Sequence, residues 1–344
     1  MNYRAYLRGI EFRLEAALEG RLTGGDVLVA LRAFVHDERA RILQVHRAGA
    51  PGRENVATLS GLTDAVVRAF FRQAVVAAGL PSVGVAPCGL VAVGGYGRRE
   101  LHPASDVDLM LLFREQDNTH LRSLTVHLFQ ALVELRFDLG YAYRSIPDCL
   151  GLADADHRSL TSLLEARFVA GQRSIFGQYR SALRRFLSPA RVDSFVERKL
   201  AEQARRREAY GAPGGEPNVK ESPGGLRDLH TARWVAQVKL GASGFGRLRA
   251  AGVLSEGEIP RCREALNVLL RVRTELHWLS GKNNVLSASL QRRVAENLGF
   301  HDLRPGAEGG TFMGRYSQCA KEVRSLSSAI VARVRAHRLS ADMV

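Results

Sequence analysis

The 344-residue chain is poor in cysteine, lysine and aromatic residues, and it has no long uninterrupted apolar run. Its cysteines, at positions 88, 149, 262 and 319, lack the spacing of a metal site or a disulfide framework, which favours a reducing, cytoplasmic setting. No apolar stretch reaches the ~20 residues that a membrane helix needs. The first residues are too polar for a secretory signal. These absences exclude a membrane-spanning protein and a small disulfide-stabilised one.

Positive charge is in excess, with 49 lysines and arginines against 35 aspartates and glutamates, a net charge of +14. Only five of the 49 are lysine, and we attribute this arginine bias to genomic base composition. The charge nevertheless favours anionic partners such as nucleotides, nucleic acid or acidic protein surfaces. The arginine run at 205–207 is interpreted as a solvated helix face.

The chain is long enough for two domains, or for one core with helical additions. Residues 1–84 show helical periodicity. Three strands are predicted: residues 90–93, an apolar run that ends at two glycines, residues 107–113, an apolar run after a polar segment, and residues 140–146, which proline would end. Helical patterns resume at 160–169, and no strand is expected beyond about residue 155. The predicted division is an N-terminal helical segment (1–84), an α/β core (85–188) and a helical domain (189–344).

The informative stretch follows the first predicted strand. Gly94 and Gly95 allow backbone N–H groups to crowd together, a geometry suited to phosphate oxygens, and Arg98 adds a positive fork. Some ten residues later Asp106 and Asp108 alternate along a strand, so their carboxylates face one side. Two such carboxylates repel each other unless a cation lies between them, and Mg²⁺ shared with substrate phosphates is the expected ion.

Residues 94–109 read GGYGRRELHPASDVDL, which resembles the signature of the DNA polymerase β-type nucleotidyltransferase superfamily. The run is closer still to the bacterial uridylyltransferases that modify signal-transduction protein PII. Residues 163–171, LLEARFVAG, and residues 216–231, EPNVKESPGGLRDLHT, resemble two further elements of that family in the expected order. The resemblance covers roughly residues 55–335.

The resemblance implies an α+β fold, with a polymerase β-like nucleotidyltransferase core (a small mixed sheet with helices) followed by an all-helical domain. It also implies Mg²⁺-dependent transfer of UMP from UTP to a tyrosine hydroxyl of PII, a step in nitrogen regulation that releases pyrophosphate. Asp106 and Asp108 would be the catalytic metal ligands. The residues implied to contact the triphosphate are Gly94, Gly95, Arg98, Ser105, Lys220 and Arg227.

A third catalytic carboxylate is expected in the superfamily, and the candidates are Asp156 and Glu165. An ion pair with a cation on a neighbouring element is the alternative explanation for Glu165. Asp228 is expected either to orient Arg227 or to cap a helix. Three segments depart from the family pattern: Arg99 and Ser222 replace glycines, and residues 140–144 read GYAYR where GHSVR is expected.

Other functions stay open at this point. The chain could be a protein adenylyltransferase acting on glutamine synthetase or another protein, or a non-catalytic paralogue that binds a partner. An RNA-tailing enzyme is disfavoured, because no RNA-binding signature accompanies the arginine content. Full-length family members continue into an HD hydrolase domain and two ACT domains. We expect both to be missing, in either a fragment or a short paralogue, and the His-Asp pairs at 36–37 and 301–302 to be structural or exposed.

Overall fold

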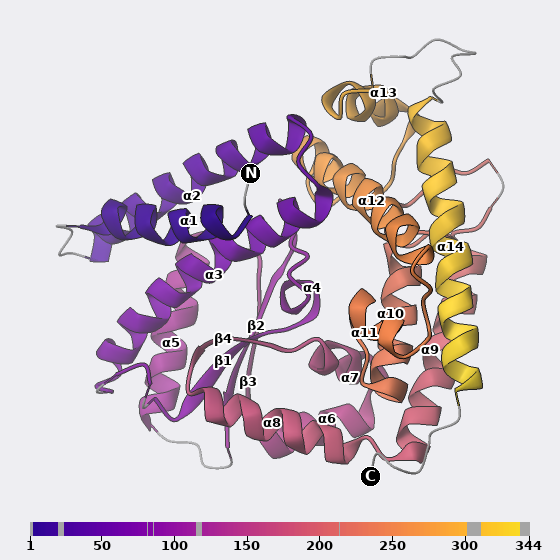
Figure 1. Cartoon of the computed structure of the whole chain (residues 1–344). Helices are drawn as coiled ribbons and strands as arrows, with labels where there is room; N and C mark the ends of the chain where they lie inside the picture. The colour runs from indigo at the N-terminus through magenta and orange to yellow at the C-terminus, as the bar shows by residue number, and fades with distance from the viewer. Residues whose placement is uncertain are drawn as a thin grey trace. The chain divides into compact units, whose positions relative to one another are not determined.

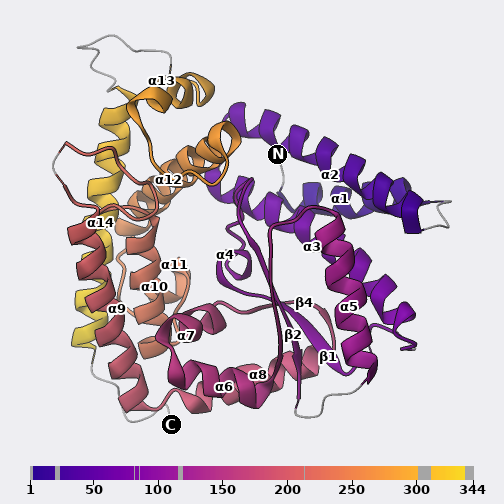
Figure 2. The same cartoon turned by 180° about the vertical axis from the view of Figure 1, so that it is seen from behind.

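The computed structural model describes residues 3–19, 24–80, 82–84, 86–114, 119–212, 214–300 and 311–337. The chain divides into two compact units (Figures 1 and 2). The first unit contains residues 1–45 and 54–186, and the second contains residues 46–53 and 187–344. The backbone therefore passes between the units three times, after residues 45, 53 and 186.

The first unit is built around a four-stranded sheet whose order is β3-β2-β1-β4. β1 runs antiparallel to β2 and β4, whereas β2 and β3 are parallel. The strands are β1 (Cys88–Ala92), β2 (Val107–Phe113), β3 (Leu139–Ser145) and β4 (Arg167–Gly171). This small mixed sheet among helices confirms the α+β class, and the first three strands confirm the sequence prediction.

The helices of this unit cover both faces of the sheet (Figure 2). They are α1 (Tyr3–Leu18), α2 (Gly24–Arg47), α3 (Gly52–Ala77), α4 (Gly94–Gly97), α5 (Thr119–Glu134), α6 (Ile146–Ala155), α7 (His157–Leu164) and α8 (Arg173–Phe186). Because strand side chains alternate, Leu90 and Leu111 pack with α3 and α5 in one buried cluster. Met110 faces the other side, where its sulfur lies 3.6 Å from that of Cys149 in α6.

The prediction that no strand follows residue 155 is wrong. Residues 157–164 form a helix, as the periodicity indicates, but β4 begins at Arg167 and pairs with β1. A run of five residues is too short for its periodicity to distinguish a strand from a helix end. The open edge of β1 decides the matter, because it offers hydrogen-bonding groups that a helix could not use.

The second unit is helical wherever it is described, apart from loops and an isolated bridge between Asn218 and Val285. Its helices are α9 (Pro189–Ala209), α10 (Leu226–Leu240), α11 (Phe245–Ala250), α12 (Glu258–Ser280), α13 (Ala288–Asn297) and α14 (Phe312–Ala336). α10 is central and contacts α9, α12 and α14. Across the described ranges, no helix combines the length and apolar character needed to cross a membrane.

Candidate active site

The two aspartates of the first motif lie at the start of β2. Asp106 is exposed and precedes the strand, and Asp108 is its second residue and partly buried. The N–H of Val93 donates to the carbonyl of Asp108 over 3.1 Å, which ties the glycine turn to this point of the sheet. Their spacing of two residues along an extended chain is the one that places side chains on the same side.

The carboxylate of Asp108 is bordered by two glycines. Gly94 has φ +56°, and a Cβ built there would lie 3.1 Å from Asp108 Oδ2. Gly140 is the residue opposite Asp108 in the parallel β2–β3 pair, and a Cβ there would overlap Asp108 Oδ1. Gly140 was not a predicted site residue. The signal that could have found it is the strand register, which a single sequence does not give.

Arg98 is held by two carboxylates at the end of the glycine turn. Its Nε donates to Glu100 over 2.8 Å, and its Nη1 donates to Glu165 over 2.6 Å. Burial would lower the pKa of Arg98, but the charges of Glu165 and Glu100 more than offset it, so the pKa is raised and the group stays cationic. Its Nη2 lies 3.7 Å from the Cβ position of Gly95. The guanidinium therefore keeps a donor-bearing edge against the glycine turn.

The remaining residues predicted for this motif have identifiable local partners. Glu165 is only 5% exposed and forms the expected alternative, an ion pair with a cation on a neighbouring element. Asp156 caps α7 by accepting from the N–H groups of Arg158 and Ser159. The Ser105 hydroxyl accepts from the N–H of His102 over 3.0 Å, which closes the turn before Asp106.

A buried carboxylate on α3, which the sequence analysis missed, anchors the glycine turn that contains Tyr96. Asp64 is 2% exposed. The Tyr96 hydroxyl donates to it over 2.7 Å, and Arg167 of β4 donates to both its oxygens over 2.9 Å. Arg99 Nη1 lies 3.6 Å from the same carboxylate. An aspartate inside an apolar helix stretch was the available signal, since buried charges are normally paired.

Arg99 occupies a backbone conformation that favours glycine. Its φ is +59°, in the left-handed region, where a residue with a Cβ is strained by about 1–2 kcal/mol. This agrees with the glycine that the resemblance leads one to expect at that position. The Arg99 side chain gains the Asp64 carboxylate as a partner, which offsets part of the strain.

In the second unit, residues 216–225 of the second motif form a tight loop, and the rest of the motif begins α10. The side-chain oxygen of Asn218 accepts from the N–H groups of Lys220 and Glu221 over 3.0 and 2.9 Å. Gly224 has φ +82°, and a Cβ there would overlap the carbonyl of Ala320 in α14. Close approach of two backbones explains why glycine is needed here.

Asp228 is fully buried and serves neither to orient Arg227 nor as a conventional N-cap side chain. Its carboxylate binds Arg206 over 2.5 Å and Arg207 over 2.9 Å, and accepts from the N–H of Gly224. Burial would raise the pKa of Asp228, but these hydrogen bonds outweigh it and lower the pKa. The arginine run at 205–207 is thus not a wholly solvated face, because Arg206 is 8% exposed and pairs inward.

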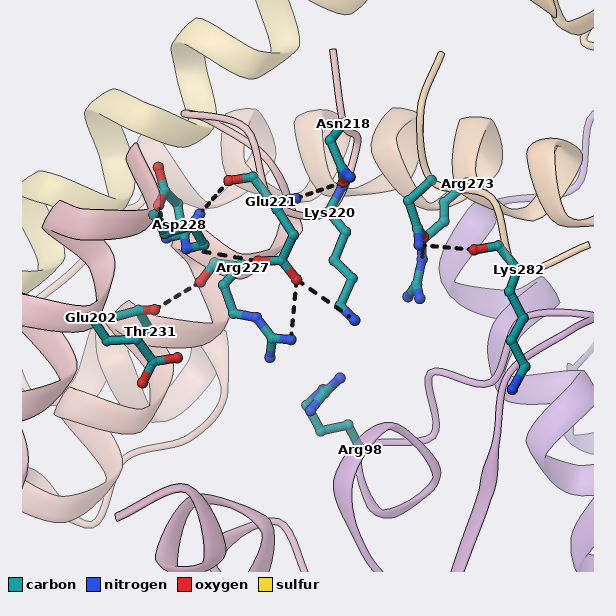
Figure 3. Close-up of polar contacts among 12 residues, drawn as sticks. Arg98, Glu202, Asn218, Lys220, Glu221, Arg227, Asp228, Thr231, Arg273 and Lys282 are labelled. Carbon is teal, nitrogen blue, oxygen red and sulfur yellow. Dashed lines mark hydrogen bonds and ion pairs between the residues drawn. The ribbon is translucent and has the colours of Figure 1, made fainter. Parts of the chain in front are cut away.

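Lys220 and Arg227 share one carboxylate within this loop. Glu221 Oε1 lies 3.6 Å from Lys220 Nζ and 3.3 Å from Arg227 Nη2 (Figure 3). The Arg227 guanidinium also lies over the ring of Trp234, 5.5 Å from its centroid. Lys220 therefore extends from a loop that internal hydrogen bonds hold together, and Arg227 extends from the first turn of α10.

The expected Mg²⁺ site can be compared with the carboxylate and other side chains that could bind a metal ion. Within the described ranges, no group of three or more histidine, cysteine, aspartate or glutamate residues is arranged to hold a metal ion. Asp106 and Asp108 supply carboxylate oxygens, and Mg²⁺ commonly binds through one or two carboxylates completed by water and substrate phosphates. The aspartate pair fits such an ion.

Comparison with known families decides which proteins share this site. A model of the GlnD PII-uridylyltransferase family matches residues 194–331, which include the loop with Lys220 and Arg227. A nucleotidyltransferase model, DUF294, matches residues 38–145, which include the glycine turn and both aspartates. The chain belongs to the PII-uridylyltransferase family. Of the two His-Asp pairs noted in the sequence, the pair at 36–37 is exposed, as expected. The pair at 301–302 lies outside the described residues.

Individual members of the uridylyltransferase family agree with this assignment. Proteins named bifunctional uridylyltransferase/uridylyl-removing enzyme are similar to the chain at 33% identity in Phenylobacterium zucineum, 35% in Caulobacter vibrioides and 34% in Thiobacillus denitrificans. The alignments cover 96%, 87% and 89% of the chain. They cover 37%, 32% and 35% of those relatives, so the chain spans about a third of their length.

Proposed function

We propose that the chain transfers UMP from UTP to a tyrosine hydroxyl of PII or a PII-like protein. The observation that carries the proposal is the pair Asp106 and Asp108, placed at the start of β2 beside the Gly94 turn. Carboxylates next to a glycine turn suit a metal-bound triphosphate. The four buried free thiols fit a cytoplasmic location for this reaction.

The site residues of the first unit each have a role in this proposal. Asp106 and Asp108 would hold Mg²⁺, which supplies charge neutralisation at the α-phosphate and polarises the acceptor hydroxyl. The Gly94–Gly97 turn and the Nη2 edge of Arg98 contact phosphate oxygens. Glu165 keeps Arg98 charged and oriented, and so acts as a positioning residue.

The bond changes follow from the chemistry of nucleotidyl transfer. The acceptor oxygen bonds to the α-phosphorus while the bond from that phosphorus to the bridging oxygen of the β-phosphate breaks. Pyrophosphate leaves, and the hydroxyl proton passes to solvent or to a carboxylate. The lysine and arginine of the second motif, Lys220 and Arg227, contact the phosphates in this proposal.

The test is the intact mass of purified PII after incubation with the chain, Mg²⁺ and each nucleoside triphosphate separately. UTP alone should add the mass of UMP, and EDTA should prevent it. Asp106→Asn should lower the rate at least about 100-fold, because a metal ligand is lost, with an unchanged circular dichroism spectrum. The control is Asp37→Asn, an exposed acid on α2, which should behave like wild type.

Three outcomes would contradict parts of this proposal. Retained activity in Asp106→Asn would remove the metal assignment. An AMP-sized increase would identify an adenylyltransferase. Absence of any adduct would favour a non-catalytic paralogue or another acceptor.

A further inference from the structure

Basic side chains from the second motif and from segments outside it gather on one face of the second unit (Figure 3). Lys220 and Arg227 come from the loop and start of α10, Arg273 from the C-terminal part of α12, and Lys282 from the loop that follows. In Figure 3 the charged ends of these four side chains extend to the same side of the loop and helices. We call this set the basic face.

Backbone contacts fix the segments of the basic face against each other. The N–H of Val219 donates to the carbonyl of Asn284 over 2.8 Å, and the N–H of Leu286 donates to Pro217 over 2.9 Å. Arg273 Nε donates to the side-chain oxygen of Asn284 over 2.7 Å. Residues more than sixty positions apart are therefore held in a preset arrangement.

One carboxylate of this loop has several cationic neighbours. Glu221 is shared among three cations, Lys220, Arg227 and Arg206, whose nitrogens lie 3.3 to 3.8 Å from it. His277 adds no charge at neutral pH. Burial, together with the nearby charges of Arg273, Lys220 and Lys282, lowers the pKa of His277 to about 4.

We propose that the basic face binds the polyphosphate part of the nucleoside triphosphate, with Arg273 and Lys282 as binding residues beyond the family motif. The inference rests on the proposed function, because it concerns the same substrate. Guanidinium forks match phosphate geometry, and lysines add mobile point charges, so together they suit a ligand that carries several adjacent negative charges.

The experiment measures binding of inorganic pyrophosphate to the whole chain by calorimetry, in EDTA and at low salt. EDTA removes divalent metal, so binding of the probe reports on the cationic groups of the protein itself. Lys282→Gln should weaken binding about fivefold, the effect of one charge contact at a hydrated surface. Glu221→Gln should strengthen it, because a neutralising carboxylate is removed.

The control is Arg205→Gln, which removes an exposed positive charge on α9 of the same unit and should change binding less than twofold. Equal effects of Lys282→Gln and Arg205→Gln would overturn the inference, as would undetectable binding to wild type. A weaker binding in Glu221→Gln would also overturn it.

Failure of this inference differs from failure of the proposed function. If wild type transfers no UMP but Lys282→Gln still weakens pyrophosphate binding, the transfer proposal fails and the basic face stands. If wild type transfers UMP while Lys282→Gln leaves pyrophosphate affinity and the KM for UTP unchanged, the basic face fails and the transfer proposal stands.

Discussion

At the scale of single residues, the position of the Asp108 carboxylate depends on what its neighbours lack. Gly94 and Gly140 border it from two different segments, and a Cβ at either would approach its oxygens. Asp64 acts through the turn itself, since its contacts with Tyr96 and Arg167 hold the segment that contains Gly94. Small side chains and a buried anchor together define where the Asp108 carboxylate lies.

Gly140→Ala should therefore impair catalysis much more than folding. The added methyl group overlaps Asp108 Oδ1 and displaces the carboxylate, and a misplacement of about 1 Å can cost about 100-fold in rate. The measurement is the initial rate of UMP transfer to PII alongside the thermal midpoint. Gly151→Ala in α6 is the matched control, because no atom lies near its Cβ position and its activity should not change. A wild-type rate in Gly140→Ala would show that Asp108 is not constrained there.

Without the family resemblance, the residue pattern predicts the site only where its parts are adjacent in the chain. Asp106, Asp108 and Gly94 lie in one short run whose order has a physical meaning, so their association could be inferred. Gly140 and Asp64 lie more than thirty residues from the atoms they contact, and their roles depend on strand register and helix packing. Local patterns do not encode those distances.

At the scale of elements, the same limit separates the strands that were predicted from the one that was missed. β1 and β2 carry apolar runs that can be recognised in the sequence, whereas β4 exists because it pairs with β1. The junction of α2 and α3 shows another long-range dependence. Glu275 of α12 is completely buried and binds His46 and Arg47, more than 220 residues earlier.

Because of the contacts of Glu275, we expect the stability of the fold to decrease at acidic pH. Burial would raise the pKa of Glu275, but hydrogen bonds from His46, Arg47 and Asn297 outweigh it and lower the pKa to about 2. A depressed carboxylate pKa stabilises the fold above the unfolded-state value of about 4.3, and this stability is lost as the pH falls toward 2. The contribution should decline from about 3 kcal/mol at pH 7 to about 1 kcal/mol at pH 3.

Glu275→Gln isolates this effect from other titrating groups. Urea unfolding of wild type and variant at several pH values should show a stability difference that narrows by about 2 kcal/mol between pH 7 and pH 3. A difference that does not vary with pH would mean that Glu275 titrates alike in the folded and unfolded chain.

At the scale of the whole molecule, each of the two units is formed by two separate stretches of the chain. Residues 46–53 belong to the second unit although they precede the sheet of the first. They supply His46 and Arg47 to Glu275, and the N–H of Gly52 donates to Asn267 of α12. The second unit is therefore assembled from two separate stretches of sequence.

A fragment of residues 187–344 should be markedly less stable than the same unit in the whole chain. Without residues 46–53, the Glu275 carboxylate loses its charged partner, and breaking a buried pair in this way costs about 3–5 kcal/mol. Thermal unfolding followed by circular dichroism is the measurement. The same fragment carrying Glu275→Gln should melt at a higher temperature, because it buries no charge. Identical melting of the two fragments would contradict this explanation.

The three passages of the backbone between the units also bear on inheritance. A single recombination event near residue 187 would separate the helical unit from the short stretch at 46–53 that completes it. Each product would combine that stretch from one parent with the partner helix of the other, so Arg47 and Glu275 would come from different genes. Exchange of one unit between related genes therefore requires several coordinated breakpoints, so the sheet and the helical unit should descend together.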